Sequence, residues 1–312
     1  MPYIDFHCDT LSRLLENPTE NLIENTGHID MKRLLSVGTI AQFFACYVDT
    51  EYPAFTTSHY DDVFKMAETL KTTLADLPSA ALALSYEDYL KNRKENKLSC
   101  FLTVEEGGVL ENDMERLYKL HEIGIRLITL TWNHENCLGY PHNMSTQPGT
   151  GLKPFGMDVI KEMERLKMLI DVSHLSDQGF YDVLNNTKRP FVASHSCCRD
   201  VFGHSRNLTD QMIRDLGERQ GLVGINFYGD FMSNNSTSTI KEIIHHLKHL
   251  INVGGLDIAA IGTDFDGIDG NLEITGCQDM PLLFQAMEKE GFKPSEIEAV
   301  CYKNAERVLG FL

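Results

Sequence analysis

The sequence predicts an α/β fold of the (β/α)8 barrel type, because eight apolar, β-branched runs alternate with amphipathic helical segments along its 312 residues. Runs such as Leu222–Ile225 are almost wholly apolar, as expected of parallel strands that are buried on both faces. A doubly wound open sheet is the alternative, but no glycine-rich phosphate loop follows the first run. We therefore expect residues 1–312 to form a single barrel domain.

The strands are recognised as short apolar runs that are bounded by polar or glycine-containing segments. In chain order they are expected at Tyr3–Asp9, Thr39–Val48, Ser99–Glu105, Arg126–Thr131, Met168–Ser173, Phe191–Ser194, Leu222–Phe227 and Ile258–Asp264. Apolar residues spaced three or four apart mark the helices, and Pro294 is typical of a helix start. The helices are expected at Asp61–Leu77, Met114–Glu122, Asp158–Leu166, Asp177–Leu184, Asp210–Glu218, Thr239–Asn252, Pro281–Glu290 and Pro294–Leu309.

The composition excludes several classes of partner. The formal net charge of −17 repels phosphate groups, so neither nucleic acid nor an anionic membrane surface is expected to bind. No apolar run is long enough to span a membrane, and the segment Met1–Asp5 has no basic stretch ahead of an apolar one. We therefore expect a cytoplasmic protein. The eight cysteines include no CxxC pair, which argues against a cysteine-based zinc site.

Polar residues follow the predicted strands at one end, where the functional groups of such a barrel gather. Six of the eight strand ends carry a His, Asp or Glu, namely His7 with Asp9, Glu105 with Glu106, His134, His174, His195 and Asp264. Any one of these could cap a helix or be a satisfied polar group of the core. Their repetition at the same end of successive strands instead predicts a metal site.

Imidazole and carboxylate groups are suitable ligands for Zn²⁺ or another borderline divalent ion. The number of carboxylates indicates two ions, because a glutamate can bridge metals about 3.5–4 Å apart. His245 and His249 are spaced like the ligands of a helical zinc site, but no Glu follows the first of them, so we expect a solvated helix face. Surface or loop positions are expected for His28, His59, His121, His142 and His204.

Six short motifs together resemble the renal (membrane) dipeptidase family of metallopeptidases, and they are Asp5–Thr10, Val104–Gly108, Asp171–His174, Ala193–Ser196, Ser205–Asn207 and Gly262–Gly267. The resemblance extends to Asn304–Val308 and so covers essentially the whole chain. It implies a barrel with a binuclear zinc centre. In that centre His7 and Asp9 hold one ion, His174 and His195 hold the other, and Glu105 bridges them. Asp264 would be the general acid/base, and Arg206 would contact the substrate.

The chain departs from the family pattern at two positions. Glu105 and Glu106 both qualify as the bridging glutamate, and counting back from Leu130 and Thr131 favours Glu105, which leaves Glu106 where mammalian members have glycine. Mammalian members also carry a substrate-contacting histidine where this chain has Trp132. His134 lies two residues further on and is expected to bind substrate in its place. Tyr228, at the end of the seventh strand, is assigned to substrate binding as well.

These residues predict a zinc-dependent dipeptidase. Two Zn²⁺ ions, or two other divalent ions, would lower the pKa of a shared water from about 15.7 towards about 7 and provide a metal-bridging hydroxide. Asp264 could take the proton and pass it to the departing amine, while the fork of Arg206 suits a terminal carboxylate. Expected substrates are L-Xaa-L-Xaa and, from the resemblance, L-Xaa-D-Xaa dipeptides. The resemblance also suggests a homodimer.

Two alternatives stay open at this stage. One is another binuclear-metal barrel hydrolase that acts on a β-lactam, a lactone or a cyclic amide. The other is a barrel that binds metal without catalysis, and the departure at Trp132 is its only support.

Overall fold

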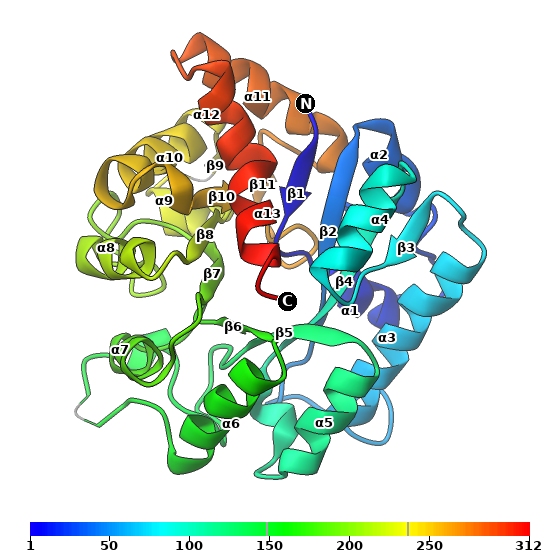
Figure 1. The fold of residues 1–312 in the computed structure, drawn as a ribbon, viewed down its shortest axis with the longest axis vertical. Coiled ribbons are helices and arrows are strands. Elements are labelled where there is room, and N and C mark those ends of the chain that lie inside the picture. Colours follow the sequence, from blue (N-terminus) through cyan, green and yellow to red (C-terminus); the bar gives the residue numbers. More distant parts are fainter. Residues whose placement is uncertain (148, 236) are drawn as a thin grey trace.

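The computed structural model, which describes residues 1–147, 149–235 and 237–312, is built around a closed barrel of eight parallel strands (Figure 1). The barrel strands are β1 (Tyr3–Asp5), β2 (Thr39–Tyr47), β4 (Leu98–Glu105), β5 (Ile125–Thr129), β6 (Leu169–Asp171), β7 (Val192–Ser196), β8 (Leu222–Ile225) and β10 (Ala259–Ile261). Their order is β2-β1-β10-β8-β7-β6-β5-β4, and the pairing of β2 with β4 closes the ring. The predicted fold class is therefore confirmed.

The strands that were expected from the sequence are the barrel strands, although several are shorter than predicted. The first ends at Asp5 rather than Asp9, and the fifth expected strand is only Leu169–Asp171. A ninth strand, β3 (Ala80–Leu82), pairs with β4 outside the ring and was not predicted. The small sheet formed by β9 (Thr237–Ser238) and β11 (Asn271–Leu272) was not predicted either.

Helices surround the ring, and their starting points follow from capping side chains. Ser58, for example, begins α3 (His59–Ala75) by accepting a hydrogen bond from the backbone N–H of Asp61, and Thr239 begins α10 (Ile240–Gly254) with a capping box closed by Glu242. The helices are α1 (Thr10–Glu16), α2 (Met31–Ser36), α3 (His59–Ala75), α4 (Tyr86–Lys94), α5 (Met114–Glu122), α6 (Pro154–Arg165), α7 (Asp177–Asn186), α8 (Asp210–Glu218), α9 (Gly229–Met232), α10 (Ile240–Gly254), α11 (Met280–Lys289), α12 (Pro294–Glu298) and α13 (Asn304–Leu309).

The amino-terminal end of the barrel is filled by apolar side chains and covered by the last helix. Inside the barrel the phenyl group of Phe43 stacks between those of Phe6 and Phe101, with centroid distances of 4.5 and 4.6 Å. Val308 and Leu309 of α13 belong to the same buried cluster, and Figure 1 shows the red helix lying across the middle of the ring. Truncating one of these phenylalanines to Ala would cost about 3–5 kcal/mol. Only the carboxyl end of the barrel is therefore left for polar groups.

We infer that residues 1–312 form one domain, because the barrel takes strands from Tyr3 to Ile261 and α13 packs against β8 and β10. Over the described part of the chain, no helix has both the length and the apolar character needed to cross a membrane.

Candidate metal centre

Six of the residues singled out in the sequence meet at the carboxyl end of the barrel. They come from the ends of five different strands and from the turns that follow, and they are His7, Asp9, Glu105, His174, His195 and Asp264. All six are at least nine-tenths buried. His174 and Asp264 follow β6 and β10 in left-handed turns, with φ values of 66° and 64°. Such backbone is uncommon outside glycine, and strained residues of this kind cluster at functional sites.

The carboxylate of Glu105 lies at the middle of the cluster, and its two oxygens face different partners. Oε2 lies 3.1 Å from Nε2 of His7, whereas Oε1 lies 3.1 Å from Nε2 of His174 and 3.4 Å from Nε2 of His195. Asp9 Oδ2 is 3.2 Å from the same His7 nitrogen. Two groups of ligand atoms therefore share one carboxylate, which is the arrangement that a bridging glutamate needs.

Hydrogen bonds at the outer nitrogens turn two of the histidines towards the cluster. Nδ1 of His174 lies 2.9 Å from the amide oxygen of Asn133, which can only accept. Nδ1 of His195 lies 2.7 Å from Oγ of Ser194, and that hydroxyl donates to Asp171. Both Nδ1 atoms are therefore protonated, and both Nε2 lone pairs are directed at Glu105. Burial lowers the pKa of His174 to about 4, which keeps the imidazole in its neutral, metal-binding form.

Two buried aspartates hold the strand ends in register. Asp171, in β6, accepts hydrogen bonds from the backbone N–H groups of Ser173 and Ser194 at 3.0 and 2.8 Å. Asp5, in β1, accepts from the backbone N–H of Thr263 at 2.9 Å and from its hydroxyl at 2.7 Å. Each carboxylate thus ties one ligand-bearing strand to its neighbour. The sequence contained a signal for them, since each interrupts an apolar strand two residues before a polar position.

The donor set fits a pair of divalent cations. Within the described residues, Nε2 of His7 and Oδ1 of Asp9 are buried without a hydrogen-bond partner. Burial alone would lower the pKa of His7, but the carboxylates of Glu105 and Asp9 raise it well above its usual value. Burial raises the pKa of Asp9. Three buried carboxylates and three imidazoles at such distances are the nitrogen and oxygen ligands that Zn²⁺ and similar ions take.

Glu106 points away from this cluster, although it is next to Glu105 in sequence. Its carboxylate accepts hydrogen bonds from the backbone N–H of Gly108 at 2.6 Å and of Trp132 at 2.8 Å, and a third from the side chain of Asn136. Its backbone is in the left-handed region, with φ of 87°. The turn after β4 therefore sends one carboxylate to the barrel centre and uses the other to fix the loop after β5.

A cavity of about 330 Å³ opens above the cluster. Asp9, Glu105, His174 and Asp264 form its floor, and its walls include the aromatic side chains of Tyr47, Trp132, Tyr228 and Phe231. Its volume is at the lower end of the range for small-molecule sites. Tyr228, which was expected to bind substrate, therefore lies where it can do so. Its hydroxyl donates to Asp230 at 3.2 Å.

Arg206 lies behind the wall of this cavity, beside His195. Its guanidinium donates to Oγ of Ser196 at 2.7 Å and to the carbonyl of His195 at 2.8 Å, and it lies over the ring of Phe231. Its Nε is buried and has no partner in the described part of the chain. The group is thus a buried cation with a spare donor next to three carboxylates.

His134 is not brought into the cavity with the other candidates. Its side chain is 38% exposed, its Nε2 lies 3.8 Å from Oδ1 of Asp49, and its ring centroid is 5.5 Å from that of Trp132. The sequence analysis did not identify His142 as part of the site, because this histidine was expected at a surface or loop position. This histidine is 9% exposed and lies between Asn133 and the hydroxyl of Ser205, at 3.2 and 2.8 Å. It thereby links the amide that orients His174 to the loop that carries Arg206.

Known proteins of the same kind match almost the whole chain. A family model described as membrane dipeptidase, peptidase family M19, matches residues 1–311. A dipeptidase of Claviceps purpurea is 27% identical over 320 residues, which cover 98% of this chain and 73% of that protein. The crystal structure of a metallopeptidase of family M19, a dipeptidase, has a TM-score of 0.91 and 28% identity, and covers 99% of this chain and 98% of its own. A metallopeptidase from Rhodobacter sphaeroides, liganded with a phosphinate mimic of the dipeptide L-Ala-D-Ala, has a TM-score of 0.90, 27% identity and the same coverage.

Proposed function

We propose that this chain, which belongs to the membrane dipeptidase family, peptidase family M19, and is therefore a metallo-dipeptidase, works with two divalent ions, zinc first among them, held by five of the six residues of the centre. One ion would be held by His7, Asp9 and Oε2 of Glu105, and the other by Oε1 of Glu105, His174 and His195. The observation that carries this assignment is the division of the two Glu105 oxygens between His7 and the histidine pair. When bound, the ions would activate a water molecule for attack and polarise the scissile carbonyl.

Asp264 is proposed as the general acid/base. Its Oδ2 accepts a hydrogen bond from the side-chain amide of Asn226 at 2.8 Å, and its Oδ1 faces the cluster, 3.7 Å from Nε2 of His7. One oxygen is thus anchored while the other is turned to the place of reaction. Burial raises the pKa of Asp264 above its ordinary value, which makes the carboxylate a stronger base for the proton of a water molecule. Asp264 would take the proton of the attacking water and deliver it to the departing amine.

The proposed substrates are L-Xaa-L-Xaa and L-Xaa-D-Xaa dipeptides. The Nε–H of Arg206, which is unpartnered among the described residues, would donate to the terminal carboxylate, and Tyr228 would contact the substrate from the cavity wall. The Rhodobacter sphaeroides relative supports a D-residue at the second position, because it is liganded with a mimic of L-Ala-D-Ala. His134 has no part in this scheme, since it is not among the residues that line the cavity and its Nε2 faces Asp49. A cytoplasmic location and a homodimer stay predictions from the sequence.

The test is hydrolysis of L-Ala-L-Ala and L-Ala-D-Ala by the full chain loaded with Zn²⁺, followed by release of free alanine. We expect both to be cleaved, and we expect Asp264→Asn to keep its metal while losing most of its activity. A metal-loaded protein that cleaves neither dipeptide, or an Asp264→Asn variant of undiminished rate, would contradict the proposal. Cleavage of a lactone or a β-lactam in place of dipeptides would favour the broader hydrolase alternative.

A further inference from the structure

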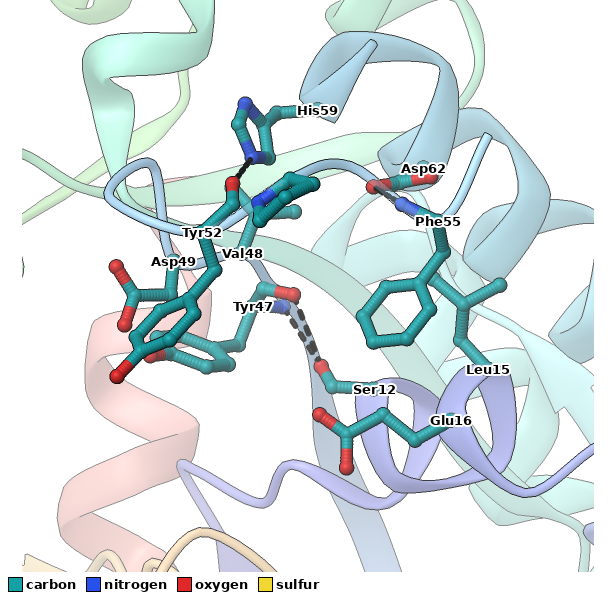
Figure 2. Close-up of a pocket in the computed structure, with 11 residues that line it drawn as sticks. Ser12, Leu15, Glu16, Tyr47, Val48, Asp49, Tyr52, Phe55, His59 and Asp62 are labelled. Atoms are coloured by element: carbon teal, nitrogen blue, oxygen red, sulfur yellow. Dashed lines mark hydrogen bonds between the residues drawn. The ribbon is translucent and has the colours of Figure 1, made fainter. Parts of the chain in front are cut away.

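A second cavity, of about 420 Å³, lies next to the proposed active site at the end of β2. The ring of Tyr47 is part of the lining of both cavities, so the two spaces share a wall. Figure 2 shows Tyr47 and Tyr52 on one side of this second cavity, with Phe55 and Leu15 on the other. The proposed reaction, as described above, makes no use of this space.

The cavity is preformed, because hydrogen bonds fix its walls. The hydroxyl of Ser12 in α1 bonds both the backbone N–H and the carbonyl of Tyr47, at 3.0 and 3.2 Å. Asp62 of α3 accepts from the backbone N–H groups of Phe55 and Thr56, at 3.0 and 2.7 Å. The loop after β2 is thus attached at each end to a helix. A cavity held in this way can receive a ligand without the cost of ordering its walls.

The lining is apolar in its body and acidic at its edge. Leu15, Val48 and Phe55 contribute apolar surface, while Glu16 and Asp49 contribute carboxylates. The described residues that line it include no lysine or arginine. Tyr52 and Phe55 are 70% and 62% exposed, which is unusual for large aromatic side chains held in place by a fixed loop. Such a surface fits a bulky apolar group and repels an anion.

The position of the cavity in the barrel indicates which part of a substrate reaches it. In the ring of eight strands, β2 and β7 are four places apart in either direction and therefore lie opposite one another. Arg206, the proposed partner of the terminal carboxylate, is on the loop after β7. A dipeptide whose carboxylate lies at Arg206 and whose scissile bond lies over Glu105 therefore directs its amino-terminal residue towards β2 and Tyr47.

We propose that this second cavity is the subsite for the side chain of the substrate's amino-terminal residue, and that it selects bulky apolar side chains over acidic ones. The inference rests on the proposed dipeptidase reaction and deepens it by naming the preferred substrate class. Burial of a phenylalanine side chain in such a space favours the substrate that carries it, whereas the carboxylates of Glu16 and Asp49 oppose a glutamate.

The test compares L-Phe-L-Ala, L-Ala-L-Ala and L-Glu-L-Ala on the metal-loaded full chain. We expect kcat/KM for Phe-Ala to exceed that for Ala-Ala roughly tenfold, with Glu-Ala the poorest substrate. Leu15→Phe fills the cavity from α1 and should bring the Phe-Ala to Ala-Ala ratio close to one. Leu282→Phe is the matched control on α11, at an exposed leucine far along the chain, and should keep the wild-type ratio. Phe55→Ala removes one wall and should lower the ratio as well.

A binding measurement separates this inference from the proposed reaction. Trp132 is the only tryptophan of the sequence and lies 5.1 Å from the ring of Tyr47, so its fluorescence reports ligands on both sides of the shared wall. The dissociation constants of the phosphinate mimics of Phe-Ala and Ala-Ala should differ roughly tenfold in the wild type and far less in Leu15→Phe. Equal constants in the wild type would overturn the subsite even if dipeptides are cleaved. Tighter binding of the phenylalanine mimic without cleavage of any dipeptide would support the subsite and overturn the reaction.

Discussion

Replacing each of the two adjacent glutamates by glutamine should separate metal binding from loop stability. Glu105 lies between three imidazoles, whereas Glu106 accepts three hydrogen bonds in the loops around Gly108 and Trp132. Glu105→Gln and Glu106→Gln remove the same charge at neighbouring positions, so each is the matched control of the other. We expect the first to lose metal and the second to lose stability.

The size of the second effect follows from the hydrogen bonds of Glu106. One oxygen accepts from Gly108 and Asn136, and the other accepts from the backbone N–H of Trp132. A glutamine keeps only one acceptor oxygen, so its amide N–H₂ must face a donor on one of the two sides. A buried donor left without an acceptor costs about 1–3 kcal/mol, and the loss of a charged acceptor adds to it. The free energy of unfolding should therefore fall by about 2–4 kcal/mol.

The first effect is read from metal content. After dialysis against metal-free buffer, elemental analysis should find two metal equivalents in the wild type and in Glu106→Gln, and at most one in Glu105→Gln. Dipeptide hydrolysis by Glu105→Gln should fall about a thousandfold, since several kcal/mol of transition-state stabilisation depend on the ions. Urea unfolding of both variants measures stability. The reasoning is refuted if Glu105→Gln keeps both equivalents, or if Glu106→Gln loses them while its stability is unchanged.

Three further changes have definite expected outcomes. Asp264→Asn should lower kcat by about 10²- to 10⁴-fold with both metals retained, and loss of metal in this variant would show that the carboxylate is a ligand instead. Ser194→Ala removes the hydroxyl that orients His195 and should weaken metal binding about 10- to 100-fold, as measured by equilibrium dialysis. An unchanged metal affinity would show that this hydroxyl does not position His195. Burial lowers the pKa of His246 from its ordinary 6.5 to about 4. Between these two pH values the imidazole is protonated in the unfolded chain but neutral in the native state, so the free energy of unfolding decreases as the pH falls from about 6.5 to about 4. His246→Gln should abolish about 3 kcal/mol of the stability lost between pH 7 and pH 4 in urea titrations, and an undiminished loss would contradict this sign.

The ring of strands could be predicted from the sequence because buried parallel strands are short apolar runs. The same reasoning explains why the candidate metal ligands could be picked out from the sequence, since polar residues directly after such runs have few structural uses. β3 was missed because Ala80–Leu82 is only three residues long and carries no alternation. The expected helix Pro294–Leu309 is interrupted by a turn of π-helix at Ala299–Lys303, which the spacing of apolar residues does not reveal.

The supporting groups of the site were harder to predict, because their roles depend on contacts between distant segments. His142 lies in a loop without a periodic pattern, and only the folded chain brings it to Asn133 and Ser205. His134 was expected to bind substrate because it lies two residues after Trp132. In a strand that continued to this point, the two side chains would lie on the same face. β5 ends at Thr129, so the alternation is lost and the imidazole faces outwards to Asp49.

The central claim is that two ions share the carboxylate of Glu105. Anomalous diffraction at the zinc absorption edge, from crystals of the Zn²⁺-loaded protein, tests it most directly because it gives both the number and the positions of the ions. We predict two peaks, one beside His7 and Asp9 and one beside His174 and His195, each within about 2.2 Å of a different Glu105 oxygen. A single peak, or two peaks that do not share Glu105, would contradict the account.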